Sequence, residues 1–393
     1  MQIGNESLLI SNISLSSILH LSKEQNVQTI DSKIKFDKEL GLIQLQCKYD
    51  NLKDPVLFQK MTFKDPSNHF WIIVDKLREL SDHISSFDLK TILALTFKDI
   101  ELANMIMTEM RNFVSVNQNF LQPNSEVREI TQSLEALEID IANADVLLAR
   151  HILEHTEDPQ AVLKLFYKVL PKNGILILEV PDCSEVYTGN FFKHFWEEHL
   201  QYFTKETITN IVSSAGFNVN ECFVLNTEAE DVILIIALKT PNISKYSFQV
   251  PKNPIQTIND EIKHLELIFT TLERMNLKIG LIGSTHSNIN LVDMFATNPD
   301  NYVFFEANPE RVGKYVTKHL VQINDAHCPQ KNGIDLYISS ISAERQFLYY
   351  KDFLAKKNIT QVFTTDELRA RLRMTDLHLL DRRQLLKRLH SRN

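Results

Sequence analysis

The chain has 393 residues, 44% of them hydrophobic, which is enough for two or three domains with ordinary apolar cores. Its formal net charge of −8 argues against a protein whose whole surface binds nucleic acid or an anionic membrane, because such a surface needs an excess of cations. No apolar run is long enough to span a membrane, and the first ten residues, MQIGNESLLI, lack the basic start and apolar core of a signal peptide, so we expect a cytoplasmic protein.

The four cysteines indicate neither a disulfide framework nor a zinc knuckle. They are widely scattered, and no C-x-x-C spacing occurs. We expect reduced, structural thiols at all four positions, which are Cys47, Cys183, Cys222 and Cys328.

Residues 1–75 are predicted to form a small separate module or a lid. The segments SKIKF and LGLIQLQ are strand-like, and DPVLFQKMTF follows them. Apolar periodicity is weaker here than in the rest of the chain.

Residues 76–240 alternate apolar runs with amphipathic stretches, which predicts a parallel sheet with helices on both faces. Such a sheet binds ligands at the carboxyl ends of its strands. We therefore expect TFKD, Asn117 and RHILEH to surround one crevice. The predicted strands are 91–95, 112–116, 144–149, 174–180, 217–225 and 231–238, and the predicted helices are Ile100–Met110, Pro159–Leu170 and Lys205–Ala215.

The loop after the first of these strands contains no glycine. The sequence TILALTFKDI occupies residues 91–100, and no glycine stands between Gly41 and Gly174. Tight nucleotide-binding turns generally use the positive φ that glycine adopts freely. The sequence alone leaves open whether a cofactor loop has changed here or whether the cofactor has been lost.

Residues 241–256 hold three prolines and little apolar periodicity, which is typical of a linker. A second α/β unit is predicted over residues 257–365. Its predicted strands are 277–284, 301–309 and 334–340.

Two glycines and an acid in this second unit have two possible explanations. Gly280 and Gly283, followed by Glu306, loosely imitate a dinucleotide-binding fingerprint, in which glycines admit a pyrophosphate and the acid binds a ribose. An ordinary strand-to-helix turn explains the same residues.

Residues 366–393 are predicted to form a basic helical tail. From Leu368 onward the tail has eight Lys and Arg residues against two Asp, with leucines at roughly helical spacing. Such a helix docks on a protein partner, an anionic surface or the acidic body of its own chain. No aromatic side chains are interleaved with the arginines, which argues against nucleic acid as the partner.

The stretch 149–217, which begins ARHILEH and contains LPKNGILILEVP and EEHLQYFT, resembles the second half of a class I S-adenosylmethionine methyltransferase. RHILEH and EEHLQYFT are similar to motifs of the sugar C-methyltransferase family, whose members methylate a nucleotide-linked keto-deoxysugar. LGLIQLQCKYDNLKDPVLFQKMTF resembles the N-terminal module of that family, and KIGLIGS with VFFEANPERVGKYV resembles its C-terminal Rossmann-like domain.

This resemblance implies an α/β protein with a class I methyltransferase-like doubly wound sheet, a second Rossmann-like domain and a small N-terminal module. It also implies S-adenosylmethionine as cofactor and a nucleotide-linked sugar as substrate.

The chain departs from the family in its N-terminal module. The family holds zinc there through paired cysteines, but LLISNISLSSIL and IKFDKELGLIQL stand at those places, so we expect no zinc and no metal ligands. The family's tyrosine pair is replaced by Thr62 and Phe63.

The cofactor motifs depart as well. The family loop reads acid-x-Gly-x-x-x-Gly, but this chain has residues 94–100, ALTFKDI. The ribose-binding acid after the second strand is replaced by Asn117 or Gln118. If the cofactor binds, the candidate contacts are Thr96, Lys98, Asn117 and Arg150.

The catalytic motifs are retained. His155 matches the family's histidine after the fourth strand, and Glu198 with His199 matches its EH pair, which that family uses around proton abstraction beside the ketone. Such a reaction needs a base and a group that steadies the enolate. His155 can instead cap backbone carbonyls, and His151 shares its face on a helical turn without an obvious third metal ligand.

Two functions therefore stay open at this point. One is an active methyltransferase with an unusual cofactor loop. The other is a catalytically inactive relative that serves as a partner subunit or a ligand-binding scaffold.

Overall fold

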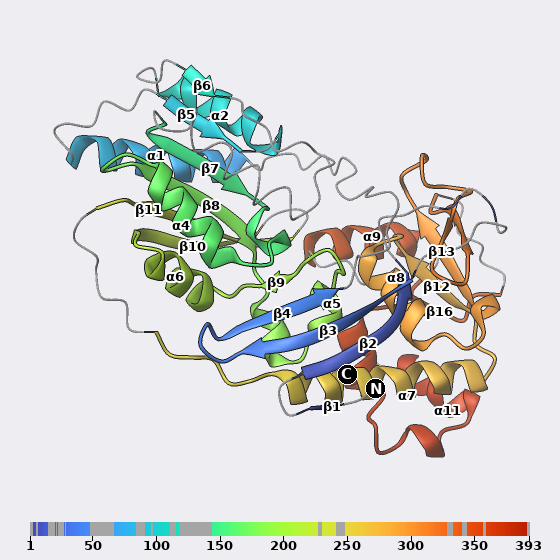
Figure 1. Cartoon of the computed structure of the whole chain (residues 1–393). Helices are drawn as coiled ribbons and strands as arrows, with labels where there is room; N and C mark the ends of the chain where they lie inside the picture. Colours follow the sequence, from blue (N-terminus) through green and yellow to red (C-terminus); the bar gives the residue numbers. More distant parts are fainter. Residues whose placement is uncertain are drawn as a thin grey trace.

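The computed structural model describes residues 3–4, 7–14, 20, 22, 27, 29–47, 67–83, 91–95, 97–110, 115–117, 144–226, 230–240, 248–327, 333–339, 344–356 and 359–390. Thr62, Phe63, Thr96 and Gln118 lie outside these ranges. The described residues form one five-stranded sheet and two six-stranded sheets, here called the N-terminal, central and C-terminal sheets (Figure 1).

The N-terminal sheet is antiparallel and recruits one strand from far along the chain. Its order is β1-β2-β3-β4-β9, and alternate residues of β3 are buried and exposed. Such alternation means that one face packs on a core while the other meets water. The strands are β1 (Ile3–Gly4), β2 (Ser7–Ser14), β3 (Thr29–Asp37), β4 (Leu42–Cys47) and β9 (Gln201–Tyr202).

The central sheet has the order β10-β11-β8-β7-β5-β6. β6, β5, β7 and β8 are parallel neighbours, whereas β11 runs antiparallel to both β8 and β10. The predicted strands are thus confirmed as elements, but the expectation of an all-parallel sheet is wrong for β11, because a short connection after β10 turns the chain back as a hairpin. The bounds are β5 (Thr91–Ala94), β6 (Ser115–Asn117), β7 (Val146–Arg150), β8 (Ile175–Pro181), β10 (Asn218–Asn226) and β11 (Asp231–Leu238).

Helices cover both faces of the central sheet, as predicted for a doubly wound fold. α1 (Ser67–His83) and α2 (Phe97–Glu109) share one apolar core with the sheet, and α4 (Pro159–Val169) and α6 (Lys205–Ser214) share another. The local signals explain the boundaries: Asp158 caps α4 before Pro159, and Thr204 and Thr207 form a reciprocal cap on α6. α1 crosses residue 75, the predicted limit of the N-terminal module.

The C-terminal sheet has the order β14-β15-β13-β12-β16-β17 and is parallel except at β14. Its strands are β12 (Ile279–Ile282), β13 (Tyr302–Glu306), β14 (Tyr315–Val316), β15 (Val321–Asp325), β16 (Leu336–Ser339) and β17 (Val362–Phe363). Its first helices are α7 (Ile255–Arg274), α8 (His286–Phe295) and α9 (Glu344–Lys356).

The glycine turn after β12 is held together by its own acid. A Cβ on Gly280 would come within 2.4 Å of the Tyr337 ring, so packing between strands requires the glycine. The Glu306 carboxylate accepts hydrogen bonds from the backbone N–H and the hydroxyl of Ser284. It also accepts from the backbone N–H groups of Ala307 and Asn308. These contacts favour the ordinary strand-to-helix turn over a ribose-binding acid.

The basic tail docks on its own chain. α10 (Thr365–Arg371), η5 (Leu377–Leu379) and α11 (Arg382–His390) contribute buried leucines to the core that underlies α7 and the C-terminal sheet. Arg382 pairs with Asp335 at 2.7 Å, and Arg388 pairs with Asp376 at 2.8 Å. Self-docking, one of the predicted alternatives, is therefore observed for this segment.

One core joins the N-terminal sheet to the C-terminal unit. It contains residues of β2, β3 and β4 together with residues of α7, α8 and β12, and Figure 1 shows the N-terminal strands beside α5 (Phe191–His194) and α7. Within the described ranges, no helix combines the length and apolarity needed to cross a lipid bilayer.

Candidate functional site

The candidate site lies where the chain leaves the carboxyl end of β7. β7 ends at Arg150, His151 adopts a left-handed φ of 51°, and η2 (Leu153–His155) follows at once. The N–H of Leu200 donates to the carbonyl oxygen of Glu154 at 2.6 Å. This bond fixes the turn formed by residues 196–200, here called the EH turn, against η2.

His155 is held in one tautomer by the EH turn. Its Nδ1 donates to the carbonyl oxygen of Glu198 at 2.9 Å, so the neutral ring carries its lone pair on Nε2. The ring centroid lies 4.9 Å from that of His199 and 5.8 Å from that of Trp196. The structure thus brings together the three predicted catalytic residues, Glu198 through its backbone carbonyl.

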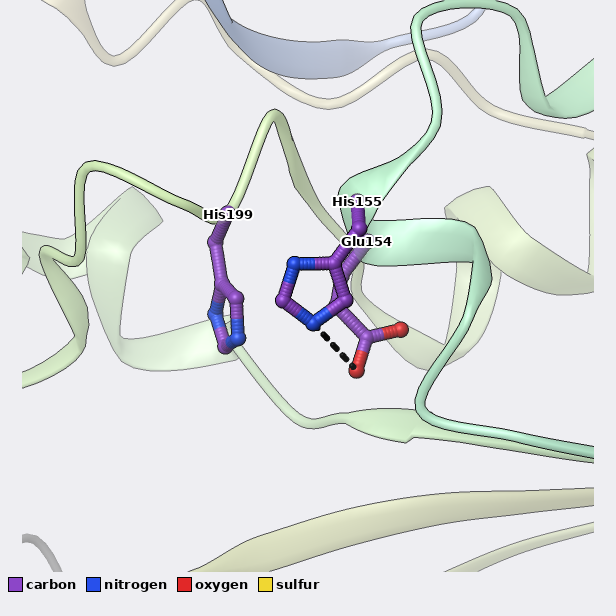
Figure 2. Close-up of side chains that lie close together, drawn as sticks. All are labelled: Glu154, His155 and His199. Carbon is purple, nitrogen blue, oxygen red and sulfur yellow. Dashed lines mark ion pairs between the residues drawn. The ribbon is translucent and has the colours of Figure 1, made fainter. Parts of the chain in front are cut away.

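Glu154 adds a carboxylate to this group. Its Oε1 lies 4.0 Å from His155 Nε2, and donor atoms of Glu154, His155 and His199 all lie within 4.8 Å of one another. Figure 2 shows Glu154 and His155 reaching the same space from η2, while His199 approaches from the opposite side. All three side chains are buried. These three residues are here called the His–Glu cluster.

A buried ionic layer lies beneath the cluster. Arg150 donates to Glu179 Oε1 at 3.0 Å, and His151 bridges Glu154 at 3.1 Å and Glu179 at 3.0 Å. Burial opposes the charged imidazole, but the hydrogen bonds and charges of Glu154 and Glu179 outweigh it and raise the pKa of His151 to about 9. Burial likewise opposes ionisation of Glu154, yet His151 lowers the pKa of that carboxyl. At neutral pH the layer therefore contains an imidazolium and carboxylates.

His151 does not form a metal pair with His155, because both of its ring nitrogens face the carboxylates of Glu154 and Glu179. The left-handed backbone at His151 turns its side chain back towards β8.

Aromatic rings connect the cluster to the C-terminal unit. Trp196 stacks on His286, the first residue of α8, with ring centroids 5.4 Å apart, and packs against His199 at 4.5 Å. Burial, with smaller contributions from His194 and Arg311, lowers the pKa of His286 to about 4, so its ring is neutral. The phenylalanines of FFKHFW belong to the apolar core, whereas Trp196 borders the site.

Of the four predicted cofactor contacts, only Arg150 has a side chain within the described part of the chain. Arg150 lies at the carboxyl end of β7, but its guanidinium is buried against Glu179. Lys98 lies in the first turn of α2, and Asn117 is the last residue of β6. The side chains of both residues, and the whole of Thr96, are outside the part of the chain that the structure describes. At the end of β5, Ala94 and Leu95 are fully buried. The roles of these residues at a cofactor stay predictions.

Several residues of the site were not predicted from the sequence. Glu154 stands inside RHILEH. Glu179 is the one acid in the buried strand ILILEVP, and its position there is a signal that the sequence offers, because a buried acid needs a partner. The stacking of Trp196 on His286 has no local signal, since 89 residues separate the two rings in sequence.

Comparison with known proteins supports the fold. Residues 56–221 match the family model described as a methyltransferase domain, and no curated protein matches the chain. With the observed sheet, this match shows a class I methyltransferase-like fold.

Two similar solved structures each cover less than half of the chain. The N-methyltransferase NodS of Bradyrhizobium japonicum, in complex with S-adenosylhomocysteine, is 13% identical, with 46% of this chain and 94% of that chain covered and a TM-score of 0.29. A complex between the Haloferax volcanii Trm112 methyltransferase activator and a candidate methyltransferase is 10% identical, with 44% and 95% covered and a TM-score of 0.30. Neither likeness is close enough to carry a functional argument.

Proposed function

We propose that the protein transfers a methyl group from S-adenosylmethionine to a carbon atom beside the ketone of a nucleotide-linked sugar, with the buried His–Glu cluster of its methyltransferase-like domain as the catalytic site. The observation that supports this most is the fixed tautomer of His155, which directs the lone pair of Nε2 into the cluster.

The roles follow from the chemistry of the reaction. Removal of a proton beside a carbonyl needs a base with a free lone pair, and His155 Nε2 is that base in this proposal. The carboxylate of Glu154, 4.0 Å away, favours the imidazolium that forms. His199, on the opposite side of the space, is the candidate donor to the developing enolate oxygen.

The residues at the end of β5, where the family's cofactor loop would begin, favour a second function, which is a ligand-binding scaffold without catalysis. The apolar side chains of Ala94 and Leu95 are buried at the end of β5, and no glycine follows them before Gly174. Losing two hydrogen bonds to buried polar groups, at about 1 to 3 kcal/mol each, weakens cofactor binding by roughly 30- to 20,000-fold.

The experiment that tests the proposal separates proton abstraction from cofactor binding. The protein is incubated in D₂O with a nucleoside-diphosphate-linked keto-deoxysugar, and NMR follows the loss of the signal of the proton beside the ketone. We expect exchange in the wild type and in the control His194→Ala, and at least a hundredfold slower exchange in His155→Ala. Calorimetric titration with S-adenosylhomocysteine is run in parallel.

The outcomes distinguish the two functions. Exchange that depends on His155, together with cofactor binding, supports the methyltransferase. Absence of both up to millimolar ligand contradicts it and supports the scaffold. Exchange that survives in His155→Ala refutes the assignment of the base.

A further inference from the structure

The His–Glu cluster has the donor composition of a metal centre as well as that of an acid–base site. Two imidazoles and one carboxylate are the ligands that bind catalytic zinc and non-haem iron in many enzymes. Such ligand sets leave coordination positions free for water or substrate. We infer that Glu154, His155 and His199 bind one divalent first-row transition-metal ion through a carboxylate oxygen and two imidazole nitrogens. The inference does not rest on the proposed methyl transfer.

The separations of the donor atoms are close to those that an ion requires. Tetrahedral donors with bonds of about 2.1 Å lie about 3.4 Å apart. Here Glu154 Oε1 and His155 Nε2 are 4.0 Å apart, and His199 completes a set within 4.8 Å. Contraction by about 1 Å is within the reach of side-chain rotations, because His199 enters from a different segment than the other two donors (Figure 2).

The surroundings orient the donors as an outer coordination layer does. Metal-bound histidines usually donate their second ring N–H to a carbonyl or carboxylate, and His155 Nδ1 already donates to the carbonyl of Glu198. Glu154 Oε1 accepts a hydrogen bond from His151 Nδ1, and this bond fixes the orientation of the carboxylate. Its other oxygen, Oε2, is buried and has no hydrogen-bond partner among the described residues. In Figure 2 this oxygen points away from the two imidazoles, so Oε1 is the candidate ligand atom of Glu154.

The donors also set the class of the ion. They are nitrogen and oxygen atoms without thiolate, so the site differs from the zinc site of the family that the sequence resembles, whose paired cysteines this chain does not have. The same lone pair of His155 Nε2 would bind the ion or accept a proton, but not both. Metal binding and the proposed base catalysis therefore compete, whereas a scaffold without catalysis would use the cluster for the ion alone.

The test uses the full-length protein and metal alone. After treatment with a chelator, the protein is titrated with Co²⁺, and calorimetry and the visible d–d absorption of bound Co²⁺ report binding. We expect one ion per chain in the wild type and in His194→Ala. We expect at least a hundredfold weaker binding in Glu154→Gln and in His199→Phe, which keeps an aromatic ring against Trp196 but removes both donor nitrogens.

Two results would overturn the inference. One is no saturable Co²⁺ or Ni²⁺ binding up to millimolar ion. The other is binding that His199→Phe leaves unchanged while its circular dichroism and thermal transition match the wild type. If Glu154→Gln fails to fold, His199→Phe decides alone. Because no sugar or methyl donor is present, failure here leaves the proposed methyl transfer untouched.

Discussion

Replacing Glu261 by glutamine should make the protein more stable at pH 8 while leaving its stability at pH 5 nearly unchanged. Glu261 lies in α7, almost fully buried, and accepts hydrogen bonds from the backbone N–H groups of Phe191 and Phe192 at the start of α5. Arg369 lies 4.0 Å away. Burial, which outweighs these favourable contacts, raises the pKa of Glu261 from 4.5 to about 7.

The direction of the effect follows from this shift. A carboxyl group whose pKa is raised in the folded state binds its proton more tightly there than in the unfolded chain. Its contribution to stability is therefore fully present below pH 4.5 and is lost as the pH rises through about 7. Raising the pKa of Glu261 from 4.5 to about 7 corresponds to about 3 kcal/mol of unfolding free energy, which is an upper bound because the structure relaxes around the charge.

The assay is urea unfolding of the wild type and Glu261→Gln at pH 5, 6, 7 and 8. Glutamine keeps an oxygen that accepts from Phe191 N–H but does not ionise, so the difference between the two proteins isolates this one group. We expect the difference in unfolding free energy to grow with pH in favour of the variant. A difference that is constant from pH 5 to pH 8 would refute the reasoning.

Three further changes test the packing around the site and the tail. Gly280→Ala should destabilise the protein by about 1 to 3 kcal/mol in urea unfolding, because its Cβ would meet the Tyr337 ring at 2.4 Å; an unchanged midpoint would contradict this. Glu179→Gln should cost about 3 to 5 kcal/mol by the same measurement, because it removes the charge that holds two buried cations; a loss below about 1 kcal/mol would show that the ionic layer is not needed. Leu385→Ala should cost about 2 to 5 kcal/mol in thermal unfolding, whereas the exposed control Leu379→Ala should stay within about 0.5 kcal/mol; equal effects would argue against a docked tail.

Most of the central sheet was predictable from the sequence, because strands buried on both faces are continuous apolar runs bounded by caps and turns. β7 and β8 are buried at every position, and Asp158 and Thr204 mark helix starts that the structure confirms. The reversal of β11 was missed, because an apolar run of that kind carries no information on strand direction.

The candidate site was predictable only in part. The contact between His155 and the EH turn was predictable only from the resemblance to a family, since His155 and Glu198 stand 43 positions apart and the sequence between them gives no local signal of contact. Glu154 was overlooked although it adjoins His155, because the side-chain direction in a short 3₁₀ turn decides whether neighbours share a space. The pairing of Trp196 with His286 depends on how two units pack, which periodicity does not report.

The short strand β9 has a consequence for how this protein can be divided. It begins two residues after His199 and pairs with β4, so the EH turn is tied at one end to the first fifty residues of the chain. At its other end, α5 is capped by Glu261 from α7, and Trp196 rests on α8. A fragment cut at residues 56 and 221, the limits of the methyltransferase family match, would lose all three supports. The smallest unit that preserves the cluster geometry is thus close to the whole chain, and binding measured on the excised domain would describe a different molecule.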